Sequence, residues 1–291
     1  EHNDKCVQLS GTDMAPATVQ RYETSLKHTR DFVWETYHKK DVLLDEVSRQ
    51  FIEDYEFWLK TEKKCCHNTA TKYLKNFKKI IRIALAKGWM KNDPFLEIRF
   101  SLDKVEPDFL EDSEIQKLIS KEIDIPRLSQ VRDIFVFCCF TGLAFSDIHG
   151  LRKEHIVEDS NGVRWIRKGR QKTKIMCNIP LMEIPLKILE KYSTNEYCKK
   201  HGVLFPVLCN QKMNAYLKEL ADICGIKKTL TTHVGRHTFA TFALANGVSI
   251  ESVAKMLGHT NVQMTRHYAR VLDRTVIREM SQIKMDFHIS I

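Results

Sequence analysis

The chain has 291 residues, of which 46 are Lys or Arg and 37 are Asp or Glu, so its formal net charge at pH 7 is +9. With 43% hydrophobic and 29% charged residues it has the composition of a globular protein rather than a disordered one, and its length predicts two domains. The longest apolar run, residues 134–140, is too short to cross a membrane, so no membrane partner is expected. The excess of positive charge suits a polyanionic partner but does not identify one.

The nine cysteines predict reduced thiols in a cytoplasmic protein. Their number is odd, no C-x-x-C spacing occurs, and two pairs are adjacent, Cys65-Cys66 and Cys138-Cys139. The first ten residues, "EHNDKCVQLS", lack the apolar region of a secretory leader. Residues 1–14 are polar, and the chain does not begin with Met. We therefore expect them to be disordered or to be a linker from a missing N-terminal region.

Three amphipathic helices are predicted between residues 15 and 95, which we expect to form a small all-helical domain. The first begins near Pro16, the second follows Ser48 as N-cap, and the third covers "NTATKYLKNFKKIIRIALAKGW". Apolar residues recur at helical spacing in each, as on faces that pack against one another. The predicted buried positions are Val19, Tyr22, Leu26, Phe32 and Val33, then Phe51, Ile52, Tyr55, Trp58 and Leu59, and then Tyr73, Phe77, Ile80, Ile81 and Ala84.

The third helix also carries a face of a single charge. Lys72, Lys75, Lys79 and Arg82 follow one another at helical spacing, and no acidic residue occurs between Lys63 and Asn92. A solvated surface usually explains charged residues on a helix. Here the like charges repel one another unless an anion lies nearby, so we interpret this face as a DNA phosphate-contacting surface.

Residues 96–108 are expected to be an interdomain linker, because Pro94 and Pro107 bracket an extended polar stretch. Residues 109–275 predict a second, mainly helical domain with a small sheet. A helix capped by Asp112 or Ser113 comes first, then a buried helix, a turn at Gly142 and a short helix. The stretch "GVRWIRKGRQKTKIMCNIPL" alternates as two strands around a basic turn. Three further helical stretches follow, "EIPLKILEKYS", "QKMNAYLKELADICG" and residues 231–270.

Residues 231–270 concentrate four histidines, three arginines and one tyrosine. His233 and His237 are spaced i, i+4, as in H-E-x-x-H zinc sites, but Val234 stands where that motif has its general base. We therefore expect no metal, and take His237 as a capping or packing residue. His233 and Arg236, spaced i, i+3, instead place an imidazole and a guanidinium on one helix face.

Such donors suit a phosphodiester in transfer, because negative charge grows on its non-bridging oxygens. His259 follows Gly258, which is expected to end a helix, and Tyr268 lies nine residues further on. A tyrosine can attack phosphorus and conserve the bond energy as a phosphotyrosine. This chemistry needs neither a metal nor another cofactor.

Three segments together resemble the motifs of the tyrosine recombinases, the phage integrase family. They are "CFTGLAFSDIHGL", "THVGRHTFAT" and "VAKMLGHTNVQMTRHYA", in this order. The similarity extends from about Phe109 to the C-terminus. Residues 15–95 resemble, more weakly, the helical core-binding, SAM-like DNA-binding domain of the family. The integrases of conjugative transposons and related bacterial mobile elements are the most similar members.

The resemblance implies roles for individual residues. Tyr268 matches the nucleophile, Arg236 the second catalytic arginine and His233 the histidine of H-x-x-R, while His259 fills a position that is His or Trp in the family. His267 has no family role. Lys172, on the basic turn, best matches the lysine that protonates the leaving 5′ oxygen. Lys168 and Lys174 are rivals for this role, and with Arg170 they are also candidates for DNA contact.

One departure from the family pattern concerns the first phosphate-binding arginine. The family has Arg directly after T-G-L, where this chain has Ala144. Loss of such a donor costs a few kcal/mol of transition-state stabilisation. Arg152, Arg167 and Arg170 are the candidates to replace it. Asp147 matches the acidic residue of the same motif, and we interpret it as a structural group.

The resemblance implies a mainly α fold with a small antiparallel β-sheet, and a site-specific DNA recombinase that integrates and excises a mobile element through a 3′-phosphotyrosine. Double-stranded DNA, a homo-tetramer on DNA and DNA-bending accessory proteins are the expected partners. Bacterial cytoplasm, with association to the nucleoid, is the expected location. A type IB topoisomerase-like enzyme and a non-catalytic DNA-binding accessory protein are the alternatives. Residues 276–291 are expected to pack on a neighbouring protomer or on their own domain.

Overall fold

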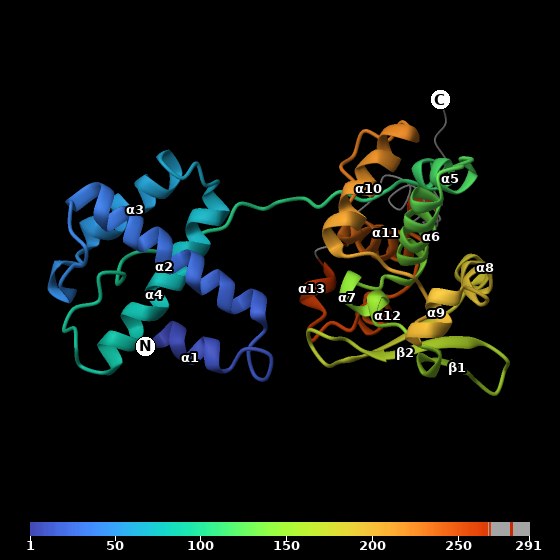
Figure 1. Cartoon of the computed structure of the whole chain (residues 1–291), viewed down its shortest axis with the longest axis horizontal. Helices are drawn as coiled ribbons and strands as arrows, with labels where there is room; N and C mark the ends of the chain where they lie inside the picture. Colours follow the sequence, from blue (N-terminus) through green and yellow to red (C-terminus); the bar gives the residue numbers. More distant parts are fainter. Residues whose placement is uncertain (267, 269–279, 282–291) are drawn as a thin grey trace, which may run out of the picture. The chain divides into compact units, whose positions relative to one another are not determined.

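The computed structural model describes residues 1–266, 268, 280 and 281, and it divides the chain into two compact units, Glu1–Val105 and Glu106–Ile291 (Figure 1). The helical content and the small antiparallel sheet confirm the expected fold class. Within the described part of the chain, no helix is both long and apolar enough to span a bilayer.

The first unit is all helical. Pro16 occupies the first turn of α2, where its missing N–H costs nothing. Ser48 caps α3 by accepting a hydrogen bond from the backbone N–H of Phe51 at 3.3 Å, as predicted. The helices bury a shared core that includes Phe32, Tyr55 and Leu74. The elements are α1 (His2–Gln8), α2 (Pro16–Tyr37), the 3-10 turn η1 (Leu44–Glu46), α3 (Arg49–Thr61) and α4 (His67–Ala86).

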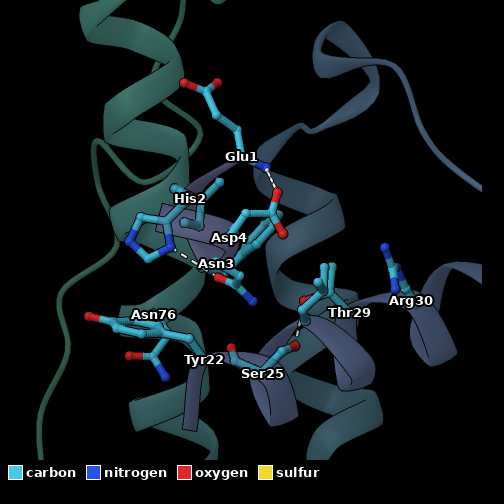
Figure 2. Close-up of a pocket in the computed structure, with 12 residues that line it drawn as sticks. Glu1, His2, Asn3, Asp4, Tyr22, Ser25, Thr29, Arg30 and Asn76 are labelled. Atoms are coloured by element: carbon cyan, nitrogen blue, oxygen red, sulfur yellow. Dashed lines mark hydrogen bonds and ion pairs between the residues drawn. The ribbon is translucent and has the colours of Figure 1, made fainter. Parts of the chain in front are cut away.

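The start of the chain differs from the sequence-based expectation. Residues 1–14 are not a disordered linker, because they contain α1, which packs on α2 and buries Cys6. The His2 ring meets Tyr22 edge-on, with ring centroids 4.9 Å apart. Figure 2 shows the pocket that α1 forms with α2 and α4, with Ser25 and Asn76 among its lining residues.

The buried faces of α2 and α4 are rotated slightly from the predicted ones. Leu26 and Ile80 are exposed, although we expected both to be buried. Leu74 and Ser25 are buried instead. The polar sequence context of these helices left the width of the apolar face undefined, and packing on α3 decides which residues it includes.

Part of the expected linker belongs to the first unit. Ile98 and Phe100 are partly buried against its core. The Asn68 side chain donates to the carbonyl of Asp103 at 3.0 Å and accepts from its N–H at 2.8 Å. The boundary between the units therefore follows Val105.

The second unit is built around α6, which is buried on nearly all sides and lies along α11 (Figure 1). Its sheet has the order β1-β2-β3, with both pairs antiparallel and Lys168 opposite Cys177. The helices are α5 (Asp112–Ser120), α6 (Pro126–Thr141), α7 (Phe145–His149), α8 (Glu183–Tyr192), α9 (Glu196–His201), α10 (Asn210–Ile223), α11 (Thr232–Ala245), α12 (Ile250–Leu257) and α13 (Gln263–Arg266), with the 3-10 turn η2 (Lys153–His155) and strands β1 (Ile156–Glu158), β2 (Arg164–Gly169) and β3 (Met176–Pro180).

Most of these elements were predicted, with three differences. Strand β1 and helix α9 were not expected, and Glu111 rather than Asp112 or Ser113 is the N-cap of α5. The expected tail, residues 276–291, lies outside the described residues except for Met280 and Ser281.

Candidate active site

The predicted site residues come from four segments of the second unit. His233 and Arg236 lie in the first turns of α11, and His259 follows α12 directly. Tyr268 lies just beyond α13. The turn between β2 and β3 carries Lys172.

Two glycines allow these segments to approach. Gly142 ends α6 with a φ of +67°, and a Cβ atom there would collide with a ring carbon of Phe239. Gly258 ends α12 with a φ of +61°, and a Cβ atom there would lie 2.7 Å from both Arg170 Cδ and Cys177 Sγ. Any other residue at either position would be strained and would push apart the segments that form the site.

Arg236 is the central cation of the site. It is only 2% exposed, and its guanidinium donates to the carbonyls of Gly142 at 2.6 Å and Leu257 at 2.7 Å. It also lies 3.0 Å from Nε2 of His259. Burial, and next the positive charge of Arg170, lower the pKa of Arg236. The guanidinium is thus held rigidly by backbone oxygens and stays available to an anion.

His259 is held in one tautomer. Arg236 can only donate a hydrogen bond, so Nε2 of His259 accepts it and the ring proton sits on Nδ1. Nδ1 then donates to the Thr265 hydroxyl at 2.8 Å. Burial, followed by the charges of Arg236 and Arg170, lowers the pKa of His259 to about 4. The imidazole is therefore neutral at pH 7.

Tyr268 is 9% exposed and packs in the cluster formed by α11 and α12. Its ring stacks on His259, with centroids 5.9 Å apart and an interplanar angle of 12°. Its backbone N–H donates to the carbonyl of Thr265 at 2.9 Å. His237, which the sequence suggested as a packing residue, lies against the same tyrosine with centroids 5.0 Å apart.

His233 lies at the solvent edge of the site. Its ring meets His237 at 4.2 Å in an edge-to-face geometry. The protein around the ring, and then the charges of Arg236 and Arg170, lower its pKa. In the described part of the chain, no three His, Cys, Asp or Glu side chains are grouped so that they could hold a metal ion.

The three lysines near the turn differ in what they contact. Lys168 donates to the carbonyl of Gly150 at 2.8 Å and lies 3.4 Å from His155 Nε2, so it fastens β2 to the preceding turn. Lys172 and Lys174 are exposed, and Lys174 has a φ of +60°. The charge of Lys172 is the smallest of the causes that lower the pKa of His233, after burial, Arg236 and Arg170.

The three arginines that could replace the one missing at position 144 also differ in their exposure and contacts. Arg152 and Arg167 are exposed, whereas the side chain of Arg170 is 10% exposed and pairs with Asp147, Nε to Oδ2, at 3.4 Å. Asp147 is almost fully buried, as expected for a structural group.

Two residues that contact the site or its neighbouring turn were not predicted from the sequence. Thr265 orients His259, and the Thr173 hydroxyl donates to the carbonyl of Gly258 at 3.2 Å. The sequence around a threonine does not indicate such a contact, because the contact forms only when two segments pack against each other in the folded chain.

In the first unit, the predicted basic face is exposed along α4. Its members are Lys72, Lys75, Lys79 and Arg82. Lys79 donates to the Tyr22 hydroxyl at 2.9 Å, and the Lys75 ammonium lies 5.9 Å from the Phe100 ring centroid. The structure thus leaves these charges on the surface, where a polyanion can reach them.

Comparison with known families and proteins matches both units. Residues 108–275 match the model of the phage integrase family, and residues 1–101 match that of the phage integrase SAM-like domain. A tyrosine recombinase of Pseudothermotoga lettingae is 29% identical over 265 residues, covering 88% of each chain. The tyrosine recombinase XerD of Shewanella oneidensis is 24% identical over 285 residues, covering 94% of this chain and 92% of that protein.

Two solved structures share the fold. A lambda integrase dimer bound to a COC′ core site has a TM-score of 0.73 at 17% identity, covering 99% of this chain and 98% of that one. The Tn1549 transposon integrase in complex with a circular intermediate DNA has a TM-score of 0.70 at 19% identity, covering 97% and 98%.

Proposed function

Because the chain belongs to the phage integrase family and is a tyrosine-type site-specific recombinase, we propose that Tyr268 is its nucleophile and that Arg236 and His259 bind the phosphate it attacks. The observation that carries this proposal is the position of one buried tyrosine beside the imidazole and the cation, since the Tyr268 ring stacks on His259, whose Nε2 lies 3.0 Å from the Arg236 guanidinium. His233 is the third member of this phosphate-binding group and lies at its solvent-exposed edge.

The reaction that this arrangement supports has two transesterification steps. The Tyr268 oxygen bonds to phosphorus while the bond to the 5′ oxygen breaks, which leaves a 3′-phosphotyrosine. The protein around its ring lowers the pKa of His233, so a neutral imidazole is available there to accept the tyrosine proton. Both ring nitrogens of His259 are already engaged, by Arg236 and Thr265, so His259 orients the site and does not act as the base. Lys172 gives a proton to the departing 5′ oxygen. A 5′-hydroxyl of a partner strand then reverses the step and joins the new strand.

The substrate that we propose is the pair of DNA sites at the ends of a mobile element, which the enzyme integrates and excises. The exposed basic face of α4, with its four cations, supports contact with duplex phosphates outside the active site. Exchange of two strand pairs requires four active sites, so we propose a homo-tetramer on DNA, with DNA-bending accessory proteins as further partners. We place this activity in the bacterial cytoplasm.

A second function is favoured by one observation. Ala144 stands where the family has its first arginine, and a chain without that charge could bind DNA without cleaving it. A non-catalytic accessory protein is therefore the alternative.

The experiment that separates these functions traps the covalent intermediate. Nicked duplexes with a randomised central segment are incubated with the protein, and DNA that stays attached after denaturation is recovered. We expect an adduct with wild type and none with Tyr268→Phe. Tight, sequence-selective binding to the duplexes by both proteins before denaturation, with no adduct from either, would support the accessory function instead. Relaxation of a supercoiled plasmid without strand exchange would indicate a topoisomerase.

A further inference from the structure

The site described above has one guanidinium where the chemistry calls for two. Arg236 can neutralise one non-bridging oxygen, but two such oxygens gain charge in the transition state. Ala144 is the N-cap of α7 and has no side chain that could reach a phosphate. A second donor must come from another segment if the enzyme retains full activity.

Of the three candidate arginines, only Arg170 is largely buried and lies against a residue of the site. Arg152 is exposed, and its backbone N–H donates to Nδ1 of His155, on the far side of the short turn η2. Arg167 is exposed on β2, two residues from the end of that strand. Arg170 lies directly after β2, and its side chain is 90% buried.

The aliphatic part of Arg170 rests on the glycine that precedes His259. A Cβ atom at Gly258 would lie 2.7 Å from its Cδ and 2.9 Å from its Cγ. The charge of Arg170 lowers the pKa of three site residues, Arg236, His233 and His259. These effects agree with the contact of the Arg170 side chain with Gly258, next to His259.

A buried carboxylate holds Arg170 in place. Asp147 accepts from Nε of Arg170 at 3.4 Å and from the backbone N–H of Gln171 at 2.9 Å. The bond through Nε directs the two terminal nitrogens away from Asp147. Asp147 follows Ala144 by three residues, so the segment that lacks the arginine still supplies the anchor for its replacement.

We propose that Arg170 supplies the missing guanidinium from the β2–β3 turn and binds a non-bridging oxygen of the scissile phosphate, with Asp147 as its positioning residue. This inference rests on the proposed function. Clustered cations around one small space are costly without an anion, and a phosphate between Arg170 and Arg236 would offset that repulsion.

The β2–β3 turn also carries the proposed general acid. Arg170 and Lys172 lie on the same turn, which is also fastened by the Thr173 hydroxyl to the carbonyl of Gly258. One docked turn therefore delivers both the second phosphate clamp and the proton donor. In the family pattern these two groups come from different segments.

The test compares adduct formation by wild type, Arg170→Ala and Arg167→Ala on a duplex recovered with wild type. Arg167→Ala removes the same charge from the same hairpin at an exposed position. We expect Arg170→Ala to slow cleavage by about 10²–10³-fold, and Arg167→Ala to change it little. Far-ultraviolet circular dichroism and Arg170→Gln, which retains more of the side chain, control for folding.

A second substrate tests the role itself. When a methylphosphonate replaces the scissile phosphate, the oxygen that Arg170 neutralises is gone, so Arg170→Ala and wild type should cleave it at similar rates. The double variant Ala144→Arg/Arg170→Ala should regain part of the lost activity on phosphate. Equal cleavage of the phosphate substrate by the Arg170 and Arg167 variants would overturn this inference alone. Absence of any adduct with wild type would instead overturn the proposed function.

Discussion

His259 meets a different neighbour at each part of its ring: Arg236 at Nε2, Thr265 at Nδ1 and Tyr268 across its face. These contacts determine where its proton sits, which a sequence motif alone does not state. Thr265 is fully buried, and its hydroxyl is the partner that the Nδ1 proton requires.

Thr265→Val tests this contact. The change keeps the shape of the side chain but leaves the His259 Nδ1–H without the hydroxyl that accepts its hydrogen bond, so the free energy of unfolding should fall by about 1–3 kcal/mol. Cleavage should slow as well, because the imidazole loses its tautomer. Thr260→Val, at an exposed position just before α13, is the control. Equal denaturant midpoints for both variants would contradict the assigned bond.

The lowered pKa of His259 predicts a dependence of stability on pH. Its value is about 4 in the folded chain and 6.5 without the protein's influence, so the unfolded chain binds the proton more readily between these values. Stability from this residue is complete above pH 6.5 and is lost as the pH falls towards 4. His259→Gln should therefore cost most stability at pH 7, and the cost should shrink by pH 5. Urea unfolding at both pH values measures it, and a cost that does not change with pH would refute the shift.

At the scale of elements, the β2–β3 turn is positioned by its contact with the end of α12. Gly258 is the point of contact, and Arg170, Thr173 and Cys177 surround it. Because Gly258 also has a positive φ, the glycine serves both the helix end and the docking of the turn.

A comparison of Gly258→Ala with Gly202→Ala separates the role of Gly258 in ending α12 from its role in docking the turn. Both glycines have a positive φ, of +61° and +64°, but a Cβ atom at Gly202 would meet nothing within 4 Å. Gly202→Ala should cost about 1–2 kcal/mol from backbone strain alone. Gly258→Ala should cost more and should also slow cleavage, since the turn is displaced. Similar unfolding free energies and full activity of both variants would show that the turn is not docked there.

The elements also show what the sequence could predict. Helices α2, α3, α4 and α6 were expected because long periodic runs and caps such as Ser48 carry a local signal. Helix α1 was missed because its sequence is polar and only Cys6 is buried. The three-residue strand β1 is too short to show alternation. Arg170 could not be separated from Arg152 and Arg167, because what distinguishes it is a contact with Asp147, 23 residues away.

At the scale of the whole molecule, the positive charges proposed for catalysis and those proposed for DNA contact differ in their burial. The two arginines at the site, Arg236 and Arg170, are largely buried and held by backbone atoms or a carboxylate, whereas the cations along α4 are exposed. Exposed cations that neutralise phosphates release counterions, so their contribution depends on salt.

Lys72→Gln/Lys75→Gln should weaken DNA binding at every sequence and lower the slope of log K against log salt by about 2. Lys199→Gln/Lys200→Gln removes two exposed charges from α9, outside the proposed DNA face, and should leave the slope unchanged. Fluorescence anisotropy with a labelled duplex at several salt concentrations measures both. Equal slopes for the two double variants would mean that α4 does not contact phosphate.

The central claim is that one tyrosine becomes linked to DNA. The most direct measurement is proteolysis of the trapped adduct, followed by mass spectrometry of the peptide that carries the nucleotide. The account predicts a single modified residue, Tyr268, with the nucleotide attached through a 3′-phosphate. A nucleotide on any other side chain, or a 5′ linkage, would contradict it.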